Sequence, residues 1–226
     1  MAERFVHIEE VEGSNPSEST MKNKLLTAVL IILVLGFSLA TVLLQTNFTF
    51  IHSSRSAEVV FLSRLTGMFI VGLLFCQIVL IEKYKKLNIL FTATILILIL
   101  IHPLLTVYFN KLIFGKLDVF YPFTDMCVLC PLKEQIITLG RLAFWFYIMA
   151  IGGVMLKAYP WFKENWQKVH ALMYAVFIFA VAHMFLIDSD ARTKPFIYIY
   201  VILVAIVLVR PIKEIRKLFR GLQLGN

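Results

Sequence analysis

The sequence predicts an all-α polytopic membrane protein, a bundle of six transmembrane helices with both termini in the cytoplasm. Of its 226 residues, 60% are hydrophobic and only 16% are charged, whereas soluble domains hold about 45–50% apolar and about 25% charged residues. Six long apolar stretches follow one another along the chain, and the basic residues between them are unevenly distributed. This composition excludes an ordinary cytosolic enzyme, a disordered chain and a disulfide scaffold.

Each apolar stretch predicts one membrane-spanning helix, because about 20 residues are needed to cross the hydrocarbon core. The apolar runs are continuous rather than alternating, which favours helices over a β-barrel. Five stretches are long enough for a full crossing, and the sixth is short. In chain order they cover residues 25–44, 59–81, 87–110, 136–156, 169–187 and 195–209.

Basic residues set the expected orientation. If the chain enters the first helix from the cytoplasm, the inner segments after residue 20 hold 13 Lys and Arg, and the outer loops hold 6. Because positive charge is kept on the cytoplasmic side, we expect both termini inside the cell and the protein in the inner (plasma) membrane. The formal charge of +8 is therefore a topology signal, and no nucleic acid is expected as a partner.

The two ends of the chain differ from the membrane domain, which we assign to residues 21–210. Residues 1–20 hold five glutamates and no apolar run, which predicts a disordered leader. Met21 would make a better start, because two lysines follow it closely. Residues 211–226 place apolar and basic residues at helical spacing, which is typical of an amphipathic helix on the inner membrane surface.

Ionisable side chains inside membrane helices are costly and point to function. Four of them lie in the outer half of the predicted bundle: Arg64, His102, Arg141 and His183. Imidazoles from facing helices ligate haem iron, and guanidinium groups neutralise the two haem propionates. This set predicts one b-type haem, ligated by His102 and His183, with Arg64 and Arg141 beside the propionates.

A fifth ionisable residue, His170, lies near the inner end of the same predicted helix as His183. Their separation of 13 residues corresponds to about 20 Å along a helix, a spacing suited to a second haem. Thirteen residues miss four complete turns by about 140°, so the two rings would point apart on an ideal helix. A second haem ligated by His170, and the partner ligand it would need, therefore stay open.

A CxxC motif, Cys127 and Cys130, lies in the longest outer loop. In an oxidising compartment this spacing predicts a small local disulfide. The alternative is a redox-active pair, since CxxC thiols can have a lowered pKa. A zinc site would require two further ligands. The third cysteine, Cys76, reads as a small buried apolar residue.

Four segments resemble the ferric reductase-like transmembrane family. They are Ser63-Arg64-Leu65-Thr66-Gly67, Ile101-His102-Pro103-Leu104, Leu139-Gly140-Arg141-Leu142, and Val169-His170 with His183. Within the family, the chain is most similar to the standalone six-helix bacterial branch, which includes the haem-binding membrane subunit of a periplasmic methionine-sulfoxide reductase system. The resemblance covers roughly residues 25–210.

The resemblance implies a b-type cytochrome that moves electrons across the membrane, the electron-transfer subunit of an oxidoreductase. It also implies that His102, His170 and His183 are the haem-iron ligands, since they match the three histidines of that branch. One departure concerns the second haem. Eukaryotic members carry two histidines about 13 or 14 residues apart on the earlier haem helix, whereas this chain has Ile89 and Asn88 at those distances before His102.

The expected partners follow from this interpretation. Besides the lipid bilayer, the electron donor would be a separate flavoprotein, a quinol, or a flavin or quinone bound at the surface. The acceptor would be a periplasmic oxidoreductase or a ferric chelate, with the outer loop 111–135 as the candidate docking surface.

Two other function classes stay open. A transporter or proton relay would use the intramembrane His102, Arg64 and Arg141 to bind an anion or pass protons. A thiol–disulfide membrane oxidoreductase would centre on Cys127 and Cys130.

Overall fold

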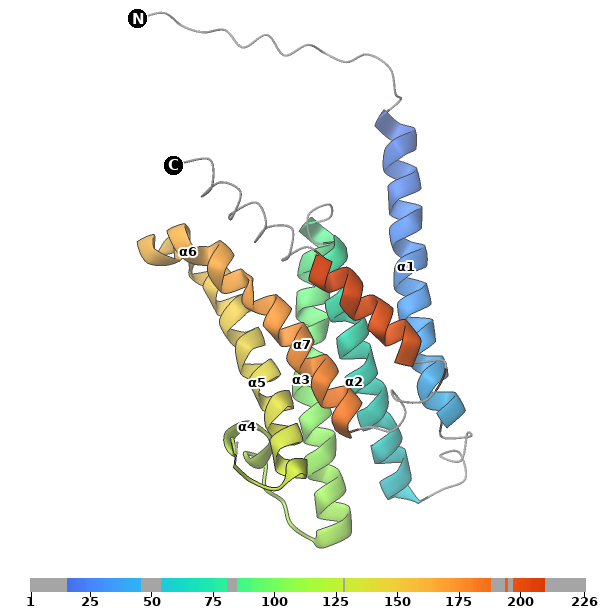
Figure 1. Ribbon diagram of the computed structural model, residues 1–226, viewed down its shortest axis with the longest axis vertical. Coiled ribbons are helices and arrows are strands. Elements are labelled where there is room, and N and C mark those ends of the chain that lie inside the picture. The colour runs from blue at the N-terminus through green and yellow to red at the C-terminus, as the bar shows by residue number, and fades with distance from the viewer. Residues whose placement is uncertain are drawn as a thin grey trace, which may run out of the picture.

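The computed structural model describes residues 16–45, 54–80, 85–127, 129–187, 194 and 197–209. Within these ranges all regular structure is helical, with no β-strand. Successive long helices run in opposite directions and form one bundle (Figure 1). The elements are α1 (Pro16–Gln45), α2 (Arg55–Leu80), α3 (Lys85–Phe114), α4 (Tyr121–Thr124), α5 (Leu132–Met155), the 3₁₀ turn η2 (Leu156–Ala158), α6 (Pro160–His170), α7 (Leu172–Ile187) and an unlabelled helix, Ile197–Val209.

Five of the described helical segments are long and apolar enough to cross a membrane. Their candidate spans are Thr27–Leu44, Arg55–Val79, Leu87–Phe114, Leu132–Ala158 and Lys168–Ile187. The chain is therefore a multi-pass, membrane-embedded helical bundle, and the predicted all-α class is confirmed.

The sixth predicted span, 195–209, corresponds to the shorter apolar helix Ile197–Val209. At 1.5 Å per residue this helix covers about 20 Å, less than the hydrocarbon core of about 30 Å. Six crossings, and the side on which the termini lie, therefore stay predictions. Residues 1–15 and 210–226, which include the expected basic tail, lie outside the described residues.

Helix boundaries differ from the sequence expectation at three places. α1 begins at Pro16, so residues 16–20 of the expected leader belong to its first turns. α5 begins at Leu132, a full turn earlier than expected. The expected helix 169–187 is divided, because α6 ends at His170, Ala171 forms a turn and α7 begins at the next residue.

α6 is an element that the sequence did not predict, because its charged residues read as an inner loop. It starts at Pro160, and proline is favoured in the first helical position because its missing N–H would have no partner there. Its charged side chains Lys163, Glu164 and Lys168 are exposed, while Phe162 is half-buried. The segment is thus amphipathic, and its charges lie on one face of a helix.

The bundle consists of two tightly packed helix pairs joined through α2 and α7. α2 packs against α3, α5 packs against α7, and α2 contacts α7 across the pairs. α1 covers α2 on the outside of the first pair. At one end of the bundle α3 ends, α5 begins and the α4 segment lies beside them (Figure 1). We call this the loop end; the charge pattern predicts that it faces outward.

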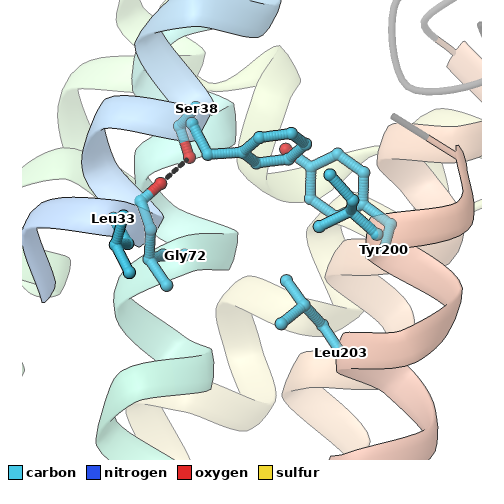
Figure 2. A pocket seen from close by; sticks show the side chains of 8 residues that line it. Leu33, Ser38, Gly72, Tyr200 and Leu203 are labelled. Atoms are coloured by element: carbon cyan, nitrogen blue, oxygen red, sulfur yellow. Dashed lines mark hydrogen bonds between the residues drawn. The ribbon is translucent and has the colours of Figure 1, made fainter. Parts of the chain in front are cut away.

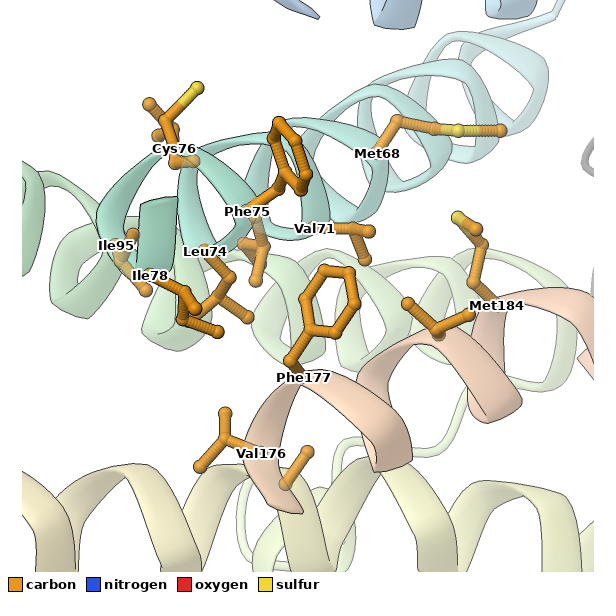
Figure 3. Packing of buried hydrophobic residues seen from close by; sticks show 14 of the residues in the cluster. Met68, Val71, Leu74, Phe75, Cys76, Ile78, Ile95, Val176, Phe177 and Met184 are labelled. Atoms are coloured by element: carbon orange, nitrogen blue, oxygen red, sulfur yellow. The ribbon is translucent and has the colours of Figure 1, made fainter. Parts of the chain in front are cut away.

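The centre of the bundle is filled by apolar side chains from both pairs. Phe177 of α7 projects toward Val71 and Leu74 of α2 (Figure 3), and all three are at most 2% exposed. Lipid tails are as apolar as these side chains, so close packing rather than water exclusion holds membrane helices together. Such packing fixes the register of α2 against α7, and with it the relative level of the residues discussed below.

Candidate functional site

His102 of α3 lies in a socket formed by α2. Its Nδ1 lies 2.8 Å from the main-chain oxygen of Ser63 and 3.3 Å from the Thr66 hydroxyl oxygen. The ring faces Gly67, where a Cβ atom would come within 3.2 Å of the ring carbon Cε1. A carbonyl oxygen can only accept a hydrogen bond, so Nδ1 carries the proton and Nε2 keeps its lone pair.

His183 of α7 lies in a second socket, formed by α5. Its Nδ1 lies 2.8 Å from the main-chain oxygen of Ile136. A Cβ atom on Gly140 would come within 3.0 to 3.2 Å of Cε1, Nδ1 and Nε2 of this ring, tighter than the contact at Gly67. The same hydrogen-bond argument leaves Nε2 of His183 unprotonated.

The two sockets repeat one arrangement. In each, the accepting carbonyl lies four residues before the glycine on the neighbouring helix, Ser63 before Gly67 and Ile136 before Gly140. One turn of α-helix separates these positions, so the ring lies along a single turn of its neighbour. A hydrogen bond that fixes one ring nitrogen and orients the other is how proteins prepare a histidine to ligate a metal.

The sockets bring the two histidines together from separate helix pairs. His102 and His183 lie close enough for the charge of one to act on the other. The two helix pairs that carry them meet through the contact of α2 with α7. The structure therefore gathers the two residues that the sequence assigned to one level of the membrane.

Arg141, one residue after Gly140, is a buried cation. It is only 2% exposed, and its Nη2 donates a hydrogen bond to the main-chain oxygen of Tyr121 at 2.9 Å. Its guanidinium carbon lies 4.7 Å from the centre of the Tyr121 ring. Nε and Nη1 are buried and have no hydrogen-bond partner among the described residues. Because a buried charge is costly unless it is paired, these two N–H groups favour an anion as ligand.

Tyr121 links this cation to the surface. Its hydroxyl donates to both carboxylate oxygens of Glu134, at 2.9 and 3.0 Å. Partial burial, followed by the hydrogen bond and charge of Glu134, raises the pKa of the Tyr121 hydroxyl above its usual value, although Arg141 opposes this. The hydroxyl therefore stays protonated at neutral pH and remains a donor.

The remaining two predicted site residues lie in different places. Arg64 is half-buried on α2, three residues before Gly67 and so within one turn of the His102 socket. His170 ends α6 and interacts electrostatically with Lys157. α6 and α7 meet at the single turn residue Ala171, and the candidate span Lys168–Ile187 runs through it and holds both His170 and His183.

The disulfide predicted from the CxxC spacing is present, joining Cys127 to Cys130. It is held against α5 by hydrogen bonds on both sides. The amide of Cys127 donates to the Thr138 hydroxyl at 3.1 Å, and the Gln135 side chain donates to the carbonyl of Cys130 at 2.8 Å. In the part of the chain that the structure describes, no three His, Cys, Asp or Glu side chains gather around a metal position, so the zinc alternative gains no support. Cys76 is buried, as expected.

A cavity among the described residues lies elsewhere. It has a volume of about 250 Å³ and lies between α1, α2 and the helix Ile197–Val209 (Figure 2). Its lining is almost entirely apolar: the Ser38 hydroxyl is already bonded to the Val34 carbonyl at 2.9 Å, and Tyr200 closes the far side. None of the predicted site residues lines it, so it is a packing gap rather than the candidate site.

Sequence reasoning missed the groups that hold the site together. From the sequence, Gly67 and Gly140 could either allow helices to approach or leave room for a macrocycle, and the carbonyls of Ser63 and Ile136 carry no sequence signal. The one signal available was that each glycine lies within a turn of an intramembrane arginine.

Comparisons with models of protein families, with curated proteins and with solved structures give no match for this chain.

Proposed function

We propose that the chain is a b-type haem membrane protein that carries electrons from a donor on the cytoplasmic side to an acceptor outside. The observation that carries this proposal is the matched pair of sockets. Two imidazoles from different helix pairs each have Nδ1 committed to a carbonyl and Nε2 free to ligate. Bis-imidazole ligation needs two such nitrogens and no third protein ligand.

The buried arginine supports the same ligand. The iron of haem b can be ligated by imidazoles. Haem b is also an anion, because it carries two propionates. The unpartnered Nε and Nη1 of Arg141 would hold one propionate, with Arg64 as the candidate for the other. When bound, the haem supplies a one-electron carrier.

The residues of the chain then have defined tasks. The carbonyls of Ser63 and Ile136 keep both imidazoles in the tautomer that ligates through Nε2. Gly67 and Gly140, which have no Cβ, leave room for the rings against the neighbouring helices. The α4 segment holds Arg141 through the Tyr121 carbonyl, so that the cation stays aimed after haem binds.

The direction of transfer rests on the predicted topology of six spans with both termini cytoplasmic. The site lies in the loop-end half of the bundle, which the basic residues assign to the outside. Electrons would enter from a cytoplasmic flavoprotein or from a quinol in the membrane. They would leave to a periplasmic oxidoreductase or a ferric chelate near residues 111–135. A reporter fused after Asn226 should be active only in the cytoplasm.

An absorption spectrum tests the proposal directly. Full-length protein purified from haem-replete membranes should show a b-type band in its reduced-minus-oxidised spectrum, and the band should appear when a flavin reductase and its nicotinamide substrate are added to the cytoplasmic face of vesicles. A spectrum without the band would overturn the proposal.

A second candidate function, thiol–disulfide exchange with an outer protein, is favoured by one observation, the Cys127–Cys130 disulfide bonded to α5 through Thr138. It requires a quinone rather than haem beside the loop. Haem-free protein that nevertheless oxidises dithiols, and loses this ability in Cys130→Ser, would favour it over the first.

A further inference from the structure

A stripe of side chains along one face of α5 holds the α4 segment, which comprises residues 120–127. The stripe consists of Glu134, Thr138, Arg141 and Trp145, whose spacing of four, three and four residues places them on one face of a helix. Each of them makes a hydrogen bond with the segment. From first to last they cover about 16 Å of α5. The segment therefore lies along about three turns of α5, beside that helix at the loop end (Figure 1).

Three of these four contacts involve main-chain groups of the segment. Nε1 of Trp145 donates to the Phe123 carbonyl at 2.9 Å. The amide of Cys127 donates to the hydroxyl of Thr138 at 3.1 Å, and Thr138 is only 4% exposed. Main-chain groups need hydrogen-bond partners wherever water is excluded. α5 therefore supplies part of the hydrogen bonding that fixes this irregular segment.

The segment also covers Arg141. Tyr121 is held at two points, since its carbonyl accepts from Arg141 and its hydroxyl donates to Glu134. Between these points its ring lies against the guanidinium group, with 4.7 Å between the guanidinium carbon and the ring centre. Arg141 belongs to the stripe that contacts the segment, so displacement of the segment would expose the guanidinium group to water.

The disulfide ties the end of this segment to the start of α5. Cys127 is the last residue of the segment, and its partner Cys130 directly precedes Pro131, the N-cap residue of α5. The carbonyl of Cys130 accepts from the Gln135 side chain. Both cysteines are half-buried, whereas Leu129, which lies between them in sequence, is 99% exposed. The disulfide therefore lies at the surface of the loop end, where an external thiol can reach it.

We infer that the Cys127–Cys130 disulfide is a thiol–disulfide exchange site that keeps the α4 segment over Arg141, and that reduction by an external dithiol uncovers this cation. A thiolate of the dithiol attacks the sulfur of Cys127, the disulfide bond breaks and Cys130 leaves as a thiolate. The positive end of the α5 dipole stabilises that thiolate, which makes Cys130 the better leaving group. The second thiol of the dithiol then attacks the mixed disulfide and releases Cys127. The dithiol is thereby oxidised to a disulfide, and its two electrons and two protons pass to the two cysteines.

Reduction removes one covalent tie and leaves the hydrogen bonds to α5 in place. A crosslink restricts the chain mainly in its open state, so without it the segment should leave α5 more often while the bundle stays folded. Each opening exposes Arg141 to water and to ions. This inference goes beyond the proposed function, because it concerns access to a buried cation, requires no quinone and applies to the haem-free chain.

Chemical labelling of Arg141 tests the inference. Full-length protein, as purified and after removal of any haem, is treated with phenylglyoxal, which modifies accessible guanidinium groups, with and without prior reduction by dithiothreitol. Peptide mass spectrometry then quantifies the label. In the haem-free protein we expect reduction to raise the labelling rate of Arg141 about tenfold and reoxidation to restore the original rate, while the exposed Arg55 is labelled equally in both states. Equal labelling of Arg141 before and after complete reduction of Cys127 and Cys130 would overturn the inference. Absence of the b-type band from the purified protein would refute the proposed function alone.

Three variants locate the effect. Cys130→Ser should label Arg141 at the rate of the reduced wild type, with no further response to dithiothreitol. Cys76→Ser is the matched control, since this cysteine is buried in α2, and it should keep the wild-type response. Thr138→Val removes the partner of the Cys127 amide but leaves the disulfide, so it should raise the labelling rate less than reduction does. A response to dithiothreitol that persists in Cys130→Ser, or is lost in Cys76→Ser, would show that the disulfide does not control Arg141. If Cys130→Ser does not fold, the cycle of reduction and reoxidation in the wild type decides.

Discussion

The two histidine sockets share one arrangement, but the contacts that hold the ring differ between them. In the α2–α3 socket, His102 has two oxygen atoms near Nδ1, and only one ring atom would crowd a Cβ on Gly67. In the α5–α7 socket, His183 has one acceptor among the described residues, and three ring atoms would crowd a Cβ on Gly140. The second socket therefore depends more on shape, and the first more on hydrogen bonding. Substitutions can separate these two dependences.

Removing either imidazole should have the largest effect and should treat the sockets alike. His102→Ala and His183→Ala should each abolish the b-type spectrum, because one imidazole cannot maintain a site that needs two. The measurement is haem content per chain in purified, folded protein. If His183→Ala retained full haem and an unchanged spectrum, the assignment of α7 as a ligand helix would be wrong.

A methyl group at each glycine should then distinguish the sockets. Gly140→Ala forces the His183 ring away from its Ile136 acceptor, an overpacking that costs about 1–3 kcal/mol. The methyl group of Gly67→Ala would crowd only one atom of the His102 ring, Cε1, so its free-energy cost should be smaller. We expect a several-fold loss of haem affinity for the first and a smaller loss for the second.

Gly152→Ala is the matched control, since it lies on the same helix as Gly140 and nothing stands within 4 Å of its added Cβ. It should bind haem like the wild type. Equal losses in Gly140→Ala and Gly67→Ala would show that the difference in clearance has no consequence.

The sequence predicted which residue types the sockets contain, but it did not predict the contacts that orient the two imidazole rings. The residue types of His102, His183 and Arg141 could be read directly, because intramembrane charges are rare, and 1.5 Å per residue converts their positions into an expected depth. The orientation of the rings could not, because it depends on carbonyl groups, which every residue has. The turn at Ala171 was also not predicted, since the apolar run continues through it.

The arginines should separate haem binding from stability. Arg141→Met removes a buried cation with two unpartnered N–H groups, so the haem-free protein should become more stable, by about 1 kcal/mol or more. The same variant should retain haem less well, because a propionate loses its partner. Arg64→Met, at a half-buried position, should weaken haem retention with a smaller gain in stability.

Melting temperatures of haem-free protein and rates of haem loss to an apo-protein acceptor measure the two effects. A higher melting temperature of the haem-free protein together with faster haem loss would show that the role of the arginine is to bind the ligand. A destabilised haem-free Arg141→Met would mean that the bond to the Tyr121 carbonyl, rather than an anion, is the reason for the arginine.

The smallest effect should come from Thr66, whose hydroxyl near Nδ1 of His102 has no counterpart near Nδ1 of His183 among the described residues. Thr66→Val removes the hydroxyl oxygen 3.3 Å from Nδ1, but the Ser63 carbonyl at 2.8 Å remains. The Thr66 hydroxyl also donates to that carbonyl, at 2.9 Å, so its loss makes Ser63 a better acceptor and offsets part of the change. Haem content should stay at the wild-type level, and the midpoint potential should move by no more than about 20 mV, which corresponds to about 0.5 kcal/mol for one electron. A larger shift, or loss of haem, would mean that Thr66 rather than the Ser63 carbonyl orients His102, and the two sockets would then be held by different groups rather than by one repeated arrangement.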